Sequence, residues 1–126
     1  MKKFYIASAM FTESQKDRIN KHAKLLRQLG YKVYVPHELE IPNAKALPNS
    51  EWARKVFQHD VQAIDECDEI LYFCEGANGD LGSAWECGYA YAKGKVIRVV
   101  ELDTMQRCIS LMVAQSSSTE ITKYQT

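Results

Sequence analysis

The sequence has no excess charge of either sign, which argues against several classes of partner. Its 126 residues include 16 Lys and Arg and 16 Asp and Glu, so the formal net charge is zero. Proteins that bind nucleic acid or anionic lipid usually carry a basic field. We therefore expect no nucleic acid and no membrane among its partners.

Long apolar runs and closely spaced cysteines are also absent. No run approaches the roughly 20 apolar residues that span a bilayer, and the polar start MKKFYIASAMFTES lacks the long apolar core of a signal peptide. The four cysteines form no C-x-x-C pair, and most lie in apolar runs, which is typical of buried, reduced thiols rather than of a disulfide framework or zinc site. We expect a cytoplasmic protein without a metal ion. The cysteines are Cys67, Cys74, Cys87 and Cys108.

Short β-prone runs alternate with helical patterns along the chain. This alternation predicts an α/β fold, a doubly wound and mainly parallel sheet of about five strands with helices on both faces. Residues 1–126 have the length of a single domain. The tail pattern allows a helix over 104–115 and a last short strand within 120–124. The other predicted strands are 3–9, 31–36, 68–75 and 95–101, and the predicted helices are 12–29, 50–66 and 83–93.

Local signals mark the ends of some of these elements. Thr12, with Gln15 three positions later, forms a capping-box pattern at a helix start, and Gly30 is expected to stop that helix. The polar segment 37–49 contains two prolines and is predicted to be an irregular loop. Loops of this length in a small protein are often functional.

Segments that follow the predicted strands should line one crevice, because open parallel sheets bind ligands at the carboxyl ends of their strands. Three glycines within 76–86 suggest phosphate binding at a helix N-terminus. However, neither the P-loop spacing nor the dinucleotide-binding spacing is present, and Asp80 would repel a phosphate. The segments expected at the crevice are 8–11, 37–49, 76–86 and the residues after 101.

Glu86 has two interpretations at this stage. The spacing of Ser83 and Glu86 matches a capping box, in which the glutamate only satisfies a helix start. Alternatively, Glu86 joins Asp80 and Asp60 in a group of acids at the crevice, and paired carboxylates suit chemistry at a glycosidic bond. Asp60 on its own is equally compatible with a solvated helix acid. Tyr5, if buried in its strand, needs a hydrogen-bond partner that a nearby carboxylate would supply.

Four motifs together resemble the nucleoside 2-deoxyribosyltransferase family. They are YIASAMFTESQ at 5–15, FQHDVQAIDECDEIL at 57–71, GDLGSAWECGYAYAKGK at 79–95 and ISLM at 109–112. The D-x-G-x-x-x-E-x-G-Y-A block is the most specific of these. The resemblance implies a flavodoxin-like fold, two-step transfer of 2-deoxyribose between nucleobases, and no metal or organic cofactor. It also implies a homo-oligomer with sites near the subunit interface.

The same resemblance implies roles for individual residues. Glu86 would be the nucleophile that attacks C1′, Tyr5 would orient it, and Asp60 and Asp80 would bind the base and handle its proton. Related enzymes carry asparagine at the position of Ser110, and that residue reaches a neighbouring subunit's site to hold the sugar hydroxyls. Gly82 would form the tight turn before the helix. The expected substrate-binding residues are Ala7, Ser8, Phe11, Gly82, Ser110 and Met112.

Two alternatives to base exchange stay open. A 2′-deoxynucleoside or 5′-monophosphate N-hydrolase would use the same intermediate and resolve it with water. A nucleoside-binding module would keep the fold without turnover. The monophosphate hydrolases tend to place serine where this chain has Asp80, and a carboxylate there lowers the affinity for a 5′-phosphate. The expected ligands are therefore 2′-deoxyribonucleosides and free nucleobases.

Overall fold

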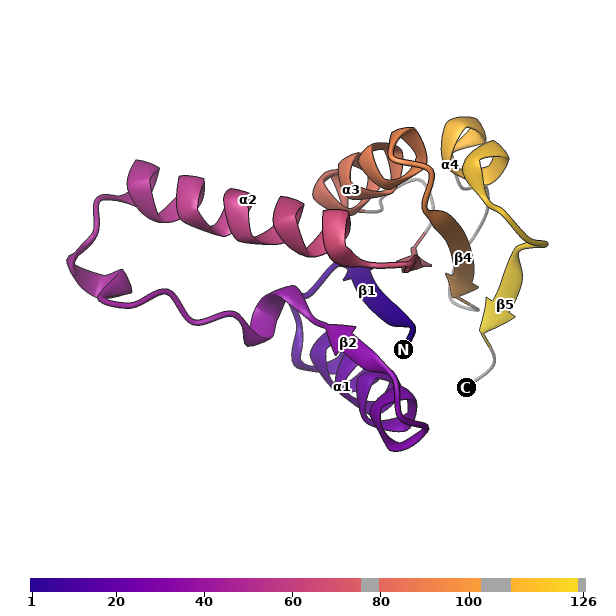
Figure 1. Cartoon of the computed structure of the whole chain (residues 1–126), viewed down its shortest axis with the longest axis horizontal. Helices are drawn as coiled ribbons and strands as arrows, with labels where there is room; N and C mark the ends of the chain where they lie inside the picture. Colours follow the sequence, from indigo (N-terminus) through magenta and orange to yellow (C-terminus); the bar gives the residue numbers. More distant parts are fainter. Residues whose placement is uncertain (76–79, 103–109, 125–126) are drawn as a thin grey trace.

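One five-stranded sheet lies at the centre of the computed structural model, which describes residues 1–75, 80–102 and 110–124 (Figure 1). The strand order is β2-β1-β3-β4-β5, and each neighbouring pair is parallel. This confirms the predicted doubly wound α/β fold. The strands are β1 (Lys3–Ser8), β2 (Lys32–Tyr34), β3 (Glu69–Cys74), β4 (Val96–Leu102) and β5 (Thr122–Tyr124).

Helices cover both faces of this sheet, as predicted. Alternate β1 side chains enter opposite cores, because successive residues of a strand point to opposite faces. Phe4 and Ile6 pack with the side of α1, whereas Tyr5 and Ala7 pack with the side of α2, α3 and α4. Figure 1 shows α1 on one side of the sheet and α3 and α4 on the other. The helices are α1 (Glu13–Gln28), α2 (Asn49–Glu66), α3 (Leu81–Ala92) and α4 (Leu111–Ser116).

The helix α2 projects beyond the sheet together with the segment that precedes it (Figure 1). That segment is irregular, as predicted, apart from two short 3-10 turns, Pro36–Glu38 and Ala44–Ala46. Apolar residues recur along α2 at the spacing of a core-facing helix, yet only Ile64 is buried. Trp52 and Phe57 remain about half exposed, at 45% and 53%. Most of the apolar side chains of α2 therefore do not pack in the core.

The boundaries of two predicted elements change. The helix α1 has the predicted capping box between Thr12 and Gln15, and Gly30 follows it with a φ of 95°. By contrast, α3 begins at Leu81 rather than Ser83, because Asp80 is its N-cap. The predicted helix over 104–115 is present only as α4, and residues 103–109 lie outside the described residues.

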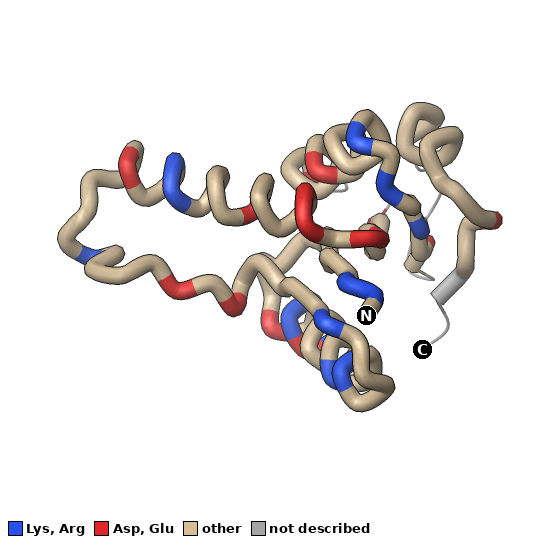
Figure 2. Tube along the Cα trace, viewed as in Figure 1, with Lys and Arg blue, Asp and Glu red and all other residues tan. Residues whose placement is uncertain are grey.

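Buried thiols and dispersed charges agree with the composition. Cys67, Cys74 and Cys87 are buried and free, while Cys108 lies outside the described residues. Figure 2 shows Lys and Arg segments interspersed with Asp and Glu segments along the chain. Within the described ranges, no helix is long and apolar enough to cross a membrane.

A compensated ion cluster lies where β3 begins. Glu69, the first residue of that strand, is 2% exposed. Its carboxylate accepts hydrogen bonds from Lys2 Nζ, at 3.3 Å, and from Arg98 Nε. Each oxygen of the buried carboxylate thus has a cationic donor, which offsets the cost of removing the charge from water.

Candidate active site

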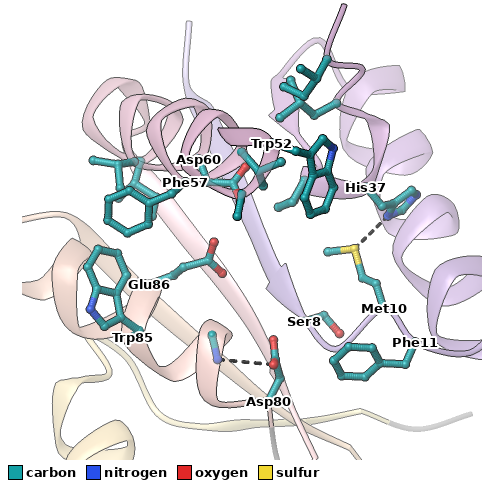
Figure 3. Close-up of a pocket in the computed structure, with 18 residues that line it drawn as sticks. Ser8, Met10, Phe11, His37, Trp52, Phe57, Asp60, Asp80, Trp85 and Glu86 are labelled. Carbon is teal, nitrogen blue, oxygen red and sulfur yellow. Dashed lines mark hydrogen bonds between the residues drawn. The ribbon is translucent and has the colours of Figure 1, made fainter. Parts of the chain in front are cut away.

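A cavity of about 740 Å³ opens beside the carboxyl end of β1, between α2 and α3 (Figure 3). Its position agrees with the crevice expected from the strand order. Residues of the irregular segment before α2 also contribute, which confirms the expectation that this segment reaches the crevice. The labelled lining side chains are Ser8, Met10, Phe11, His37, Trp52, Phe57, Asp60, Asp80, Trp85 and Glu86.

Glu86 points into this cavity from the second turn of α3 (Figure 3). The hydroxyl of Tyr5, which is fully buried, donates a hydrogen bond to its Oε2. The pKa of Glu86 is raised to about 7, mainly by burial and also by the charges of Asp60 and Asp80, against the lowering effect of the Tyr5 hydrogen bond. The glutamate is therefore poised between its acid and carboxylate forms near neutral pH, which suits a reactive group.

Asp80 takes the capping role that the sequence assigns to Ser83. Its Oδ1 accepts from Gly82 N at 3.3 Å, and its Oδ2 accepts from Ser83 N at 3.1 Å and Ser83 Oγ at 2.7 Å. The capping-box interpretation of Glu86 is therefore wrong, because Ser83 is inside the helix. Gly82 also lies within the first turn of α3, not in a turn before it.

Asp60 faces the same cavity from α2 and is half-buried. Tyr34 Oη donates to Asp60 Oδ1 at 2.8 Å. Burial raises the pKa of Asp60, while the Tyr34 hydrogen bond and the charge of His59 lower it. Asp60 is thus not a simple solvated helix acid. Its partner Tyr34 is absent from the sequence-based site, because the register that places it beside Tyr5 is not visible in one strand alone.

The remaining predicted residues divide into two groups. Ser8 and Phe11 line the cavity, with Ser8 Oγ donating to Ala9 O at 3.1 Å and Phe11 largely exposed. Ala7 is fully buried in the core and is not among the lining residues. Ser110 and Met112 also lie outside the cavity lining: Ser110 Oγ caps α4 by accepting from Met112 N at 3.2 Å.

Aromatic walls are the main feature that sequence reasoning missed. Trp52 and Phe57 come from the α2 stripe that is not buried, and Trp85 of α3 lies beside Phe57 (Figure 3). The Phe57 and Trp85 ring centroids are 5.3 Å apart. Helical spacing identifies these residues as one apolar face, but it does not distinguish the wall of a cavity from a packed core.

His37 and Met10 form a second contact at the cavity wall. His37 Nδ1 lies 2.8 Å from Met10 Sδ, and His37 Nε2 lies 2.9 Å from Asn20 Oδ1. The ring thereby connects the segment before α2 to α1 and to the residues after β1. This connection helps to fix one side of the cavity.

The cavity lining is acidic as well as apolar. Asp60, Asp80 and Glu86 contribute three carboxyl groups, and no Lys or Arg is among the described lining residues. In the part of the chain that the structure describes, no group of three or more His, Cys, Asp and Glu side chains is arranged to hold a metal ion. The chemistry that these residues themselves support is nucleophilic attack and proton transfer by carboxyl groups.

Comparison with known proteins gives a consistent result. The sequence model of a family described as nucleoside 2-deoxyribosyltransferase matches residues 4–119. No curated protein matches the chain significantly. Among solved structures, the 2-deoxyribosyltransferase of the psychrotolerant bacterium Bacillus psychrosaccharolyticus is 30% identical with a TM-score of 0.82, and the match covers 98% of this chain and 86% of that one.

Two more distant structures share the fold. The CMP N-glycosidase of Clostridium botulinum is 23% identical, with a TM-score of 0.69 and coverage of 99% of this chain and 91% of that one. A 2-deoxyribosyltransferase of Leishmania mexicana is 20% identical, with a TM-score of 0.68 and coverage of 97% and 90%. The same arrangement of strands and helices therefore extends across these proteins.

Proposed function

Because the chain belongs to the nucleoside 2-deoxyribosyltransferase family, we propose that it exchanges the nucleobase of 2′-deoxyribonucleosides through a covalent deoxyribosyl–Glu86 intermediate. The observation that carries the proposal is the Glu86 carboxyl group, held by Tyr5 and directed into the cavity (Figure 3). Its pKa of about 7 supplies a large carboxylate fraction at neutral pH. An ionised carboxylate is the form that attacks carbon.

The first half of the reaction forms the glycosyl ester. Glu86 Oε1 attacks C1′ while Tyr5 holds Oε2, and the C1′–N bond breaks with its electron pair passing to the base. Asp60 supplies the proton that the departing base nitrogen takes up, since burial raises its pKa and keeps more of the acid form. The second half reverses these steps, with an incoming base attacking C1′ and returning its proton to Asp60.

The cavity walls support a planar base as the leaving group. Trp52, Phe57 and Trp85 present aromatic rings beside the acids, and nucleobases stack well on such rings. Asp80 also lines the cavity, and its oxygens hold the start of α3 as well. This arrangement supports base binding by Asp60 and Asp80 together.

The acids of the cavity favour neutral nucleosides over nucleotides. A 5′-phosphate would face three carboxyl groups, with no cationic side chain among the described lining residues. Like charges in a partly desolvated site lower affinity strongly. We therefore infer that the substrate is a free deoxynucleoside, which fits a role in nucleoside salvage. The buried free thiols support a reducing compartment such as the cytoplasm.

A homodimer or larger homo-oligomer completes the proposal. Leu81, Leu111 and Met112 are 86%, 72% and 76% exposed on the adjacent helices α3 and α4. A second copy would cover these apolar side chains and bring Ser110 and Met112, which lie outside the chain's own cavity lining, toward the partner's cavity. Analytical ultracentrifugation tests this directly, and a monomer at micromolar concentration would count against it.

Base exchange is tested by chromatography of reactions with 2′-deoxyinosine or thymidine, with and without adenine or cytosine. A parallel reaction contains deoxycytidine monophosphate, and Glu86→Gln is the control because its amide oxygen still accepts from Tyr5. We expect a new deoxynucleoside only when a base is added and Glu86 is intact. Free base without exchange would indicate a hydrolase, and binding without any turnover would indicate a nucleoside-binding module.

A further inference from the structure

Two tyrosines lie side by side on neighbouring strands. Tyr5 on β1 and Tyr34 on β2 are register partners in the parallel ladder. Their rings stack with centroids 5.3 Å apart and an interplanar angle of 14°. The stack holds the two phenol rings nearly parallel.

The two hydroxyls serve different acids on different helices. Tyr5 Oη donates to Glu86 on α3, and Tyr34 Oη donates to Asp60 Oδ1 on α2 at 2.8 Å. Both acids line the same cavity. Each acid therefore accepts one hydrogen bond from the stacked pair.

This division matters because Asp60 and Glu86 interact electrostatically. Two neighbouring carboxyl groups tend to share one proton, and they then titrate as a pair instead of performing separate tasks. Asp60 faces Tyr34 from β2 and Glu86 from α3, with Tyr5 on β1 in electrostatic reach and His59 beside it on α2. Of these, Tyr34 is the group that donates a hydrogen bond to it.

We propose that Tyr34 is a positioning residue for Asp60. This proposal rests on the proposed base exchange. By occupying Asp60 Oδ1, it directs Oδ2 to the nucleobase, so that Asp60 exchanges its proton with the base and not with Glu86. When the C1′–N bond breaks, the proton moves from Asp60 Oδ2 to the base nitrogen. In the second half it returns from the incoming base to the same oxygen.

Tyr34→Phe tests this assignment, because phenylalanine keeps the ring stacked on Tyr5 and removes only the donor. We expect kcat for base exchange to fall about tenfold to a hundredfold, as for a misplaced proton donor, with KM within about threefold. In the pH profile of base exchange, the limb assigned to Asp60 should move to higher pH, because the Asp60 carboxylate loses a hydrogen bond and its pKa rises. A variant that merely loosened the fold would not shift this limb.

Tyr89→Phe is the matched control. Tyr89 Oη donates to Asp65 Oδ1 at 2.7 Å, so it makes the same type of hydrogen bond, and neither residue is among those lining the cavity. We expect this variant to retain the kcat and pH profile of the parent protein. Equal losses in both variants, or an unchanged kcat and pH limb in Tyr34→Phe, would overturn the assignment.

Carbon NMR separates this inference from the proposed function. In protein labelled with ¹³C at aspartate Cγ, the Asp60 signal is identified through Asp60→Asn, and its titration needs no turnover. We expect Tyr34→Phe to raise the Asp60 pKa and Tyr89→Phe to leave it unchanged. If the parent protein exchanges no base, the proposed function fails and the catalytic task of Tyr34 fails with it. An unchanged Asp60 titration would overturn the Tyr34 assignment even if exchange is observed.

Discussion

Two glutamates at different places along the sheet, the buried Glu69 and the half-buried Glu86, differ in how their charge is compensated. Glu69, at the start of β3, accepts from Lys2 and Arg98. Glu86, at the cavity beside the carboxyl end of β1, accepts from the hydroxyl of Tyr5 and has Asp60 and Asp80 as charged neighbours. Both are carboxylic acids of the same length in the same fold, so the difference lies in their surroundings.

This contrast distinguishes a carboxylate that stabilises the fold from a carboxyl group in the surroundings of a functional site. A buried carboxylate with cationic partners ties segments of the chain together. A partly buried carboxyl group with a neutral donor and acidic neighbours is costly to ionise, and such groups concentrate at functional sites. By this criterion Glu69 supports the fold, whereas Glu86 has the surroundings of a functional group.

The largest expected effect compares the two glutamates directly. Glu86→Gln should reduce base exchange by on the order of 10⁴-fold or more, because an amide cannot form the glycosyl ester. Glu69→Gln should leave kcat of the folded protein within about twofold, since Glu69 is not among the residues that line the cavity. Steady-state kinetics of both variants decides the matter. Comparable losses of kcat in the two would show that this comparison is mistaken.

The second effect is on stability and depends on pH. The folded pKa of Glu86, about 7, lies above its ordinary value of 4.5. The folded state therefore binds more protons between these values, and its stability decreases as the pH rises from about 4.5 to about 7. Glu86→Gln removes this penalty, so it should be more stable than the parent protein by on the order of 3 kcal/mol above about pH 8.

Urea unfolding of Glu86→Gln and the parent protein at about pH 5 and about pH 8.5 measures this difference. The gain should shrink to less than about 1 kcal/mol at the lower pH, where the parent glutamate is protonated in the folded state. Comparing the two proteins at each pH cancels the other titrating groups. A gain that is the same at both pH values would indicate a packing effect and would contradict the role assigned to burial.

The third effect is a loss of stability, in contrast to the gain expected for Glu86→Gln, and it concerns Glu69. Arg98→Met removes one cationic donor and leaves Glu69 with Lys2 alone. We expect the free energy of unfolding to decrease by about 2 kcal/mol, because a buried carboxylate loses compensation while a half-exposed Lys2 remains. Urea unfolding at neutral pH measures it, and Lys93→Met, whose side chain lies 3.8 Å from the exposed Asp65, is the control. A loss no larger than that of the control would contradict the structural role of Glu69.

The sequence predicts the fold well, because short β-prone or apolar runs alternate with segments of helical spacing. The β-prone run 3–9 predicts β1, and Thr12 with Gln15 marks the start of α1. Glu86 is also predictable, through its motif. The Glu69 cluster is not, since its partners come from the chain before β1 and from β4, and no local pattern joins them.

Competition between two N-cap residues and the register of the strands account for the other differences between the sequence-based prediction and the structure. Asp80 and Ser83 are both good N-cap residues, and Asp80 wins because its carboxylate reaches two backbone N–H groups and the Ser83 hydroxyl. Tyr34 becomes a site residue only when β2 pairs with β1 in the observed register. Trp52 is an apolar helix residue in sequence, and it becomes a cavity wall because α2 projects beyond the sheet.

The smallest effect concerns Tyr5, the neutral donor to Glu86 among the residues that the structure describes. Activity measured as kcat/KM should rise with pH through about 7, as Glu86 ionises to its nucleophilic form. Tyr5→Phe removes a hydrogen bond that lowers the Glu86 pKa, so this limb should move to higher pH, and activity at neutral pH should fall about tenfold. Activity well above the limb should recover toward the parent value, because the carboxylate is then fully formed.

Tyr31→Phe, at a partly exposed tyrosine outside the cavity lining, should keep the limb in place. A Tyr5→Phe limb at the parent pH would mean that Tyr5 orients Glu86 without stabilising its charge, and Glu86 would then differ from Glu69 even more than the structure indicates.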